Sequence, residues 1–216
     1  MKYICVIPVH KETAEVFCEA FFSMYFQCKK YNIPIHVALD NCQQIETIDF
    51  VDRLVKSEMC ICSEFDFGNL SKVLNWYFEN YDFDYMIRMD ADDISHPDRI
   101  KNQLEYLAKH NYDIDVLGTE MFAFWDNKFD QSEKAFEKIH GEIPIPQNEN
   151  YWIINHPTAI IKRESAIKIG LYNEAMDLHD GQDTDLWMRM YKNGFVVRNV
   201  PEVLLKYRRP LRLKNH

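Results

Sequence analysis

Three aspartates stand within four positions, at Asp90, Asp92 and Asp93, directly after an apolar segment that ends at Met89. Carboxylates this close repel one another, and a shared cation relieves the repulsion. A set of oxygen-only ligands suits the hard ions Mg²⁺ and Mn²⁺. The cluster therefore indicates a divalent metal site. The alternative is an acidic, solvated turn before a helix capped by Ser95.

A second candidate site is a single carboxylate at the start of an apolar helix face. Asp183 is followed, at the spacing of one helix face, by Leu186, Trp187 and Met190. Burial raises the pKa of such a carboxyl group, whereas the N-terminus of a helix favours the ionised form. A carboxylate that is partly desolvated and still charged can act as a general base. The alternative is an ordinary aspartate at the start of a helix.

The positions of the glycines exclude a glycine-rich phosphate-binding loop. There are six, and no two lie within ten positions of each other, so neither GxGxxG nor GxxxxGK[ST] occurs. A bound diphosphate would instead need a metal ion or scattered basic groups.

Apolar strands alternate with helical segments in the first half of the chain. Strands are predicted at 3–9, 35–39, 59–62 and 84–89, with helices at 12–31 and 45–56 and a third from an Asn69 cap to about 80. This order predicts an α/β fold, with an open and mostly parallel sheet flanked by helices. Ligands of such sheets bind beyond the carboxyl ends of the strands. That rule selects the loops 10–13, 40–43, 64–69 and 90–96.

The second half is less regular. A helix is predicted from the Ser95 cap to about residue 110, with Pro97 in its first turn, and another at 182–193, ended by Gly194. Strands are predicted at 114–124 and 157–161, and the polar segment 126–150 is expected to be rich in loops. Because no repeat or change of composition divides the chain, we expect one domain over residues 1–216.

Composition restricts the class of protein. With 47% apolar and 14% aromatic residues the chain can build a core, and a net charge of −9 argues against nucleic acid as a partner. No apolar run approaches the roughly 20 residues of a membrane-spanning helix. The N-terminus reads as a strand rather than a signal peptide, and six cysteines without a CxxC pair fit a reducing compartment. We therefore expect a cytoplasmic protein.

Short segments along most of the chain together resemble inverting glycosyltransferases of family 2, which have the GT-A fold and use nucleotide-sugars. The segments are VIPVH at 6–10, ALDN at 38–41, NLSKVLN at 69–75, DADDI at 90–94, HPT at 156–158, GQDTDLWMR at 181–189 and YR at 207–208. Each is weak alone, whereas their order and spacing are specific. The resemblance implies a nucleotide-sugar-binding half at about 1–97 and an acceptor-binding half at about 98–216.

The resemblance also implies roles for individual residues. Those implied to bind the nucleotide are Pro8, His10, Glu12, Asp40, Lys72 and Asp90. Asp40 would bind the base, expected to be uracil. Asp90 and Asp92 match the DxD motif, with Asp92 the more direct ligand of Mn²⁺ or Mg²⁺ and Asp90 nearer the ribose. Asp183 matches the catalytic base.

Two positions depart from the family pattern. Gln182 stands where an acid commonly precedes the base, and Leu39 stands where a second aspartate is common before Asp40. The first change lowers the local charge beside Asp183. The second weakens the case for a base contact at Asp40.

The implied activity is transfer of a sugar from a nucleotide-sugar, expected to be a UDP-sugar, to a hydroxyl group of a glycan or lipid-linked glycan. The expected setting is bacterial surface polysaccharide or lipopolysaccharide synthesis. Acceptor contacts are expected from Trp125, His156 and Trp187. Residues 206–216 carry five basic and no acidic side chains. They can dock on anionic headgroups at the inner face of the cytoplasmic membrane, fold over the donor diphosphate, or form a solvated end.

Two other functions fit parts of the pattern. A nucleotidyltransferase also uses paired aspartates and a divalent ion, but its N-terminal glycine- and lysine-rich signature is missing, since residues 8–13 offer only Lys11. A non-catalytic nucleotide-sugar-binding protein would explain Gln182 as a sign of a decayed site. The retention of both Asp92 and Asp183 argues against this second alternative.

Overall fold

The computed structural model describes residues 1–125, 134–135, 141–145, 153–176 and 181–209. Its first half alternates strands and helices in the predicted order: β1 (Tyr3–Val9), α1 (Ala14–Lys30), β2 (Ile35–Asp40), α2 (Ile45–Lys56), β3 (Ile61–Phe65), α3 (Leu70–Asn80) and β4 (Tyr85–Arg88). All three neighbouring pairs among these four strands are parallel. The predicted α/β fold class is confirmed.

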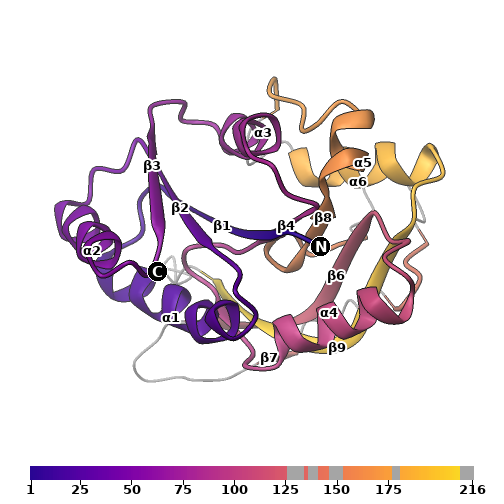
Figure 1. Cartoon of the computed structure of the whole chain (residues 1–216), viewed down its shortest axis with the longest axis horizontal. Coiled ribbons are helices and arrows are strands. Elements are labelled where there is room, and N and C mark those ends of the chain that lie inside the picture. Colours follow the sequence, from indigo (N-terminus) through magenta and orange to yellow (C-terminus); the bar gives the residue numbers. More distant parts are fainter. Residues whose placement is uncertain (126–133, 136–140, 146–152, 177–180, 210–216) are drawn as a thin grey trace, which may run out of the picture.

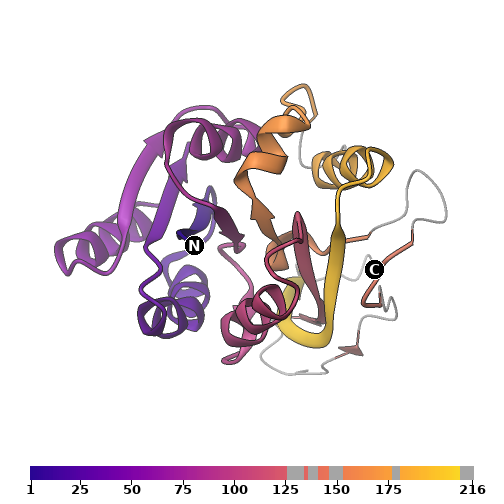
Figure 2. The same ribbon diagram turned by 45° about the vertical axis from the view of Figure 1, so that its right-hand side comes forward.

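The second half extends the same sheet with mixed strand directions. Its elements are β5 (Ile94–Ser95), α4 (Arg99–Lys109), β6 (Val116–Trp125), β7 (Lys134–Ala135), a 3-10 helix (His156–Thr158), β8 (Ile160–Lys162), α5 (Arg163–Lys168), α6 (Gln182–Lys192) and β9 (Val197–Arg209). The strand order is β3-β2-β1-β4-β8-β6-β9-β5, with β7 paired to β6. Figure 2 shows β6 and β9 side by side, as their long parallel ladder requires. One sheet thus joins the two halves.

Helices cover both faces of the sheet, because alternate strand residues point to opposite sides. In Figure 1, α1, α2 and α4 lie below the sheet, and α3, α5 and α6 lie above it. Each layer has its own core. Phe17, Phe21 and Met24 of α1 are fully buried on one side, and Leu74 and Phe78 of α3 on the other. The loops at the strand ends are therefore held on a rigid scaffold.

Local capping explains where two of these helices begin. Thr13 Oγ1 accepts the backbone N–H of Val16 at the start of α1, and Asn69 Oδ1 accepts that of Lys72 at 3.0 Å at the start of α3. Such side chains satisfy amide groups that lack a partner within the helix. The predicted cap at Asn69 is confirmed.

Four predicted elements differ from the structure. Ser95 does not cap a helix: it pairs with Leu205 of β9, and α4 begins at Arg99. The third strand begins at Ile61 rather than Met59, and the strand predicted at 157–161 begins as a 3-10 helix. The fourth difference is β9, which takes up residues 206–209 of the expected basic tail. These differences involve pairing between distant segments, which local patterns do not encode.

Close packing between β6 and β9 predicts a strong effect at Gly118. A Cβ atom there would lie 2.5 Å from Asn199 Oδ1 and 2.9 Å from a methyl carbon of Ile154, both on buried side chains. We expect Gly118→Ala to lower the free energy of unfolding by about 1–3 kcal/mol, because the buried neighbours must move. Denaturant titration measures this change, with Glu105→Ala on the exposed face of α4 as the control. Equal midpoints for Gly118→Ala and wild type would contradict it.

Candidate active site

A cavity of about 440 Å³ lies at the carboxyl ends of β1, β2 and β4. Its walls come from the loop after β1, the start of α3, the loop after β4, and Tyr207 of β9. Most of the residues predicted to bind nucleotide and metal line it: Pro8, His10, Glu12, Asp40, Asp90 and Asp92. Lys72 is exposed on α3 and is not among the lining residues. The cavity lies where the rule for parallel sheets places ligands.

Asp40 organises the floor of this cavity. Its carboxylate is buried and accepts the backbone N–H groups of Gly68 at 3.0 Å and Asn69 at 3.1 Å. Gly68 has a φ of 56°, which glycine adopts without strain. His10 Nδ1 lies 2.7 Å from the carbonyl oxygen of Asp40. Asp40 therefore ties the loops after β1 and β3 together, whatever contact it also makes with a base.

The loop after β4 brings three carboxylates close together. Asp90, Asp92 and Asp93 each place an oxygen within 4.8 Å of the others. Burial, then the charges of Asp90 and Glu12, raise the pKa of Asp92 to about 6. Burial, then the charges of Asp90 and Asp92, raise the pKa of Asp93. A cation at this loop would remove the repulsion, so the oxygen donors fit Mg²⁺ or Mn²⁺.

The three carboxylates are held differently. Asp93 is fully buried: its Oδ1 accepts the Arg208 N–H at 2.8 Å, and its Oδ2 has no hydrogen-bond partner among the described residues. Asp90 pairs with Arg88, whose Nη2 lies 2.5 Å from Asp90 Oδ1. Asp92 is half-buried on the cavity wall. This arrangement makes Asp92 the carboxylate best placed to take a cation.

Two arginines for which the sequence predicted no contact with this loop shape it. Arg88 is almost fully buried and also donates to the Met89 carbonyl oxygen. The side chain of Arg208 in β9 donates to the Asp92 carbonyl oxygen at 2.7 Å and to Glu19 of α1 at 2.5 Å. Arg88 could have been noticed in the sequence, because it is the charged residue within the otherwise apolar segment 85–89. The role of Arg208 became visible only with β9.

Asp183 lies in the first turn of α6, and its side chain is buried. It is not among the residues that line the cavity. The charges of both Asp183 and Asp90 act on Tyr172, whose pKa is raised mainly by burial. Trp187, on the same helix, packs its ring against Tyr172 with the ring centroids 6.4 Å apart. The role of Asp183 as the base stays a prediction.

The residues expected to contact the acceptor have mixed surroundings. His156 and Trp187 are buried beside Tyr172: His156 Nε2 lies 3.0 Å from the Tyr172 hydroxyl, and the Trp187 ring contacts both. Burial lowers the pKa of His156 well below its ordinary value, and Arg88 adds to the effect. The side chain of Trp125 lies outside the described residues. Acceptor contact by these three stays a prediction.

A parallel half and a mixed half that share one continuous sheet match the GT-A type fold, to which the solved structures described below also belong. The chain belongs to glycosyl transferase family 2, whose model matches residues 4–170. Residues 90–94 of the predicted DxD segment lie within that match.

Two relatives illustrate the family. The amylovoran biosynthesis glycosyltransferase AmsE of Erwinia amylovora is 28% identical over 145 residues, covering 64% of this chain and 50% of that protein. The Escherichia coli UDP-Gal:alpha-D-GlcNAc-diphosphoundecaprenol beta-1,3-galactosyltransferase is 28% identical over 141 residues, covering 64% and 49%. The chain thus spans about half the length of the curated relatives it matches.

Solved structures show the same fold. Residues 1–349 of Staphylococcus aureus TarS, in complex with UDP, superpose with a TM-score of 0.74 at 16% identity, over 97% of this chain and 61% of that one. The mannosyltransferase PcManGT of Pyrobaculum calidifontis, in complex with GDP-Man and Mn²⁺, superposes with a TM-score of 0.72 at 14% identity, over 98% and 58%. Because the sequence identities are only 14–16%, the structural similarity establishes a shared fold and nothing further.

Proposed function

We propose that this protein transfers a sugar from a nucleotide-sugar, a UDP-sugar, to a hydroxyl group of a glycan or lipid-linked glycan. The observation that carries the proposal is the convergence of Asp40, Asp90 and Asp92 on one cavity at the carboxyl ends of parallel strands. Family membership and relatives named for polysaccharide and lipid-linked glycan synthesis support it.

The nucleotide would lie over the floor formed by Asp40 and the start of α3, with Pro8, His10 and Glu12 along its side. Asp92 and Asp90 would hold Mn²⁺ or Mg²⁺, which supplies Lewis-acid stabilisation of a diphosphate leaving group. Arg88 keeps Asp90 in place, and Arg208 holds the backbone at Asp92. The acidic loop is thus arranged before a donor binds.

Asp183 would act as the general base. The acceptor hydroxyl oxygen forms its bond to the anomeric carbon while the bond from that carbon to the diphosphate oxygen breaks. Asp183 takes the hydroxyl proton, and the electron pair of the broken bond leaves with the diphosphate. A single displacement from the opposite face inverts the anomeric configuration. The burial of Asp183 in the first turn of α6 suits this role, because limited desolvation strengthens a base.

The acidic loop predicts that metal stabilisation depends on pH. The Asp92 carboxyl has a folded-state pKa of about 6, above its ordinary 3.8. Its contribution to stability is therefore present below 3.8 and is lost as the pH rises through about 6. Because the ionised form binds the cation, Mn²⁺ should raise the Tm more at about pH 8 than at about pH 5. Thermal unfolding with and without Mn²⁺ measures this, and equal increases at both pH values would contradict it.

Calorimetric titration tests the donor assignment. UDP and several UDP-sugars are titrated first with Mn²⁺ and then with EDTA, and GDP serves as the comparison nucleotide. We expect metal-dependent binding of the uridine nucleotides in the micromolar range, the ordinary scale for enzyme substrates. The tightest UDP-sugar then identifies the donor. Absence of binding to any uridine nucleotide would refute the UDP assignment, and tighter binding of GDP would redirect it to guanosine nucleotides.

The proposed setting is synthesis of a bacterial surface polysaccharide or lipopolysaccharide on the cytoplasmic side of the membrane. In the described part of the chain, no helix is both long and apolar enough to span a bilayer. Peripheral membrane contact through the basic residues 206–216 would bring the enzyme to a lipid-linked acceptor. Arg208 is the exception in this set, because its side chain donates to the Asp92 carbonyl oxygen and to Glu19, and we assign it no membrane contact.

A further inference from the structure

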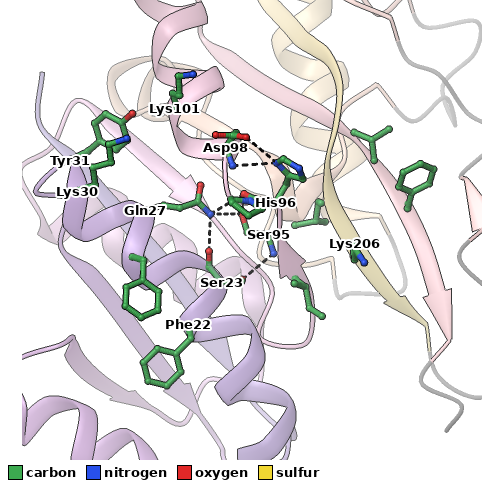
Figure 3. Close-up of a pocket in the computed structure, with 16 residues that line it drawn as sticks. Phe22, Ser23, Gln27, Lys30, Tyr31, Ser95, His96, Asp98, Lys101 and Lys206 are labelled. Atoms are coloured by element: carbon green, nitrogen blue, oxygen red, sulfur yellow. Dashed lines mark hydrogen bonds and ion pairs between the residues drawn. The ribbon is translucent and has the colours of Figure 1, made fainter. Parts of the chain in front are cut away.

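A second, larger cavity of about 700 Å³ lies beside the first. It is formed by the C-terminal part of α1, by β5 with the loop that leads to α4, and by β6 and β9 (Figure 3). Asp92 lines the first cavity, and Ile94 and Ser95 line this groove. The short strand β5 therefore lies next to both.

The polar groups at the floor of the groove are already paired. The Gln27 side-chain amide donates to Ser95 Oγ at 3.2 Å and to the His96 carbonyl oxygen at 2.9 Å, and it accepts the Ile100 N–H. Figure 3 shows the Gln27, Ser23 and Ser95 side chains bonded within this cluster. A peptide backbone would need partners of its own. A hydrocarbon chain would leave this network undisturbed.

The walls of the groove are apolar and partly exposed. Phe26 of α1 is 67% exposed and stacks on Phe22, and Val203 of β9 is 36% exposed. Phe122 and Leu205 complete the apolar lining. Burying a Phe side chain of this kind is favourable by about 1.5–3 kcal/mol. The walls therefore suit an apolar occupant.

The rim is basic although the whole chain carries a net charge of −9. Among the described residues, Lys30, Lys101 and Lys206 line the groove, and Asp98 is the one acidic residue that does so, with its Oδ2 4.0 Å from His96 Nδ1. In Figure 3, Lys30 and Lys101 lie together at one side of the groove and Lys206 at another. Basic side chains around an apolar surface are complementary to an amphiphile with an anionic head.

We propose that this groove docks the protein on a membrane surface of anionic phospholipid. Acyl chains contact Phe22 and Phe26, and Lys30 and Lys101 contact the lipid phosphates. Because β5 separates the groove from the acidic loop, docking would set the donor cavity beside the bilayer. The proposal concerns lipid binding and does not depend on the transfer reaction.

Co-sedimentation of the full chain with vesicles tests the proposal. We expect binding to vesicles of phosphatidylcholine mixed with phosphatidylglycerol, weakened by salt, and little binding to phosphatidylcholine alone. Each lysine is worth about fivefold in affinity near an anionic surface, so Lys30→Gln/Lys101→Gln should bind roughly 25-fold more weakly. Phe26→Ser should bind about tenfold more weakly.

Matched control variants lie on the opposite face of the sheet. Ile167→Ser and Lys168→Gln/Lys192→Gln change exposed residues of α5 and α6 in the same way and should bind vesicles like wild type. UDP binding should be equal in all variants, which separates this proposal from the donor assignment. Equal binding to both vesicle types, or equal losses in groove and control variants, would overturn the proposal. A third outcome would also overturn the proposal: the wild-type protein does not bind vesicles and is a dimer, and the groove variants are monomers. The groove would then be a subunit interface.

Discussion

Asp183→Asn is expected to bind the donor as wild type does and to lose transfer by about 10²–10⁴-fold, the usual contribution of a positioned base. The amide has the same shape as the carboxylate but cannot take the acceptor proton. It also adds no steric barrier in the first turn of α6, where Asp183 is buried. Turnover of a UDP-sugar with acceptor, together with calorimetric donor affinity, separates the chemical step from binding.

Asp185→Asn is the matched control, because it makes the same change of charge in the same helix turn. Asp185 forms an ion pair with Arg189 at 2.8 Å, one helical turn further on, and its side chain is partly exposed. Its loss should cost about 1 kcal/mol or less, because Arg189 keeps its hydrogen bonds to the Ile169 and Leu171 carbonyl oxygens. Transfer at the wild-type rate by Asp183→Asn would show that another group acts as the base.

Asp92→Ala is expected to abolish metal-dependent donor binding, and with it transfer. Asp92 lies on the cavity wall, whereas Asp93 is buried and Asp90 has one oxygen paired with Arg88, so Asp90 alone should not retain the cation. Calorimetry with Mn²⁺ and UDP measures the loss of binding, and Asp49→Ala on the exposed face of α2 is the control. Metal-dependent binding that survives in Asp92→Ala would move the metal site to other ligands.

The same substitution has an opposite expected effect on stability. Burial and the charges of Asp90 and Glu12 oppose the ionisation of Asp92 and raise its pKa to about 6. Without metal, and well above that pH, removing the carboxylate should raise the free energy of unfolding by roughly 1–3 kcal/mol. Denaturant titration at about pH 8 with EDTA measures this gain. A variant that lost both stability and binding would indicate that the loop had collapsed rather than lost a ligand.

Local patterns predicted the first half of the fold closely. The strand at 3–9 and the helix at 45–56 match β1 and α2 in both bounds, and the Asn69 cap begins α3 as expected. These features depend on alternation, amphipathic spacing and capping, which operate within a few residues. The position of the cavity followed from the same information, because parallel strands end at a common edge of the sheet.

The second half depended on long-range pairing. β9 was not predicted, because residues 197–209 alternate poorly and include Pro201. Ser95 has the chemistry of a helix cap, yet its backbone pairs with Leu205 and its N–H donates to Ser23 of α1. Propensity is a weak determinant where tertiary contacts compete with it. The same limit applies to the groove beside β5, whose walls come from four distant segments.

By itself, the sequence determined the α/β class and the acidic loop, since residue type and local spacing suffice for these, whereas the base role of Asp183 came from the family resemblance and stays a prediction. Only the tertiary structure decided how the three aspartates differ. Arg88 neutralises Asp90, the backbone of Arg208 holds Asp93 from 115 positions away, and Asp92 is left on the cavity wall. The physical reason is that burial and charge act through space: groups far apart along the chain set the environment of each carboxylate.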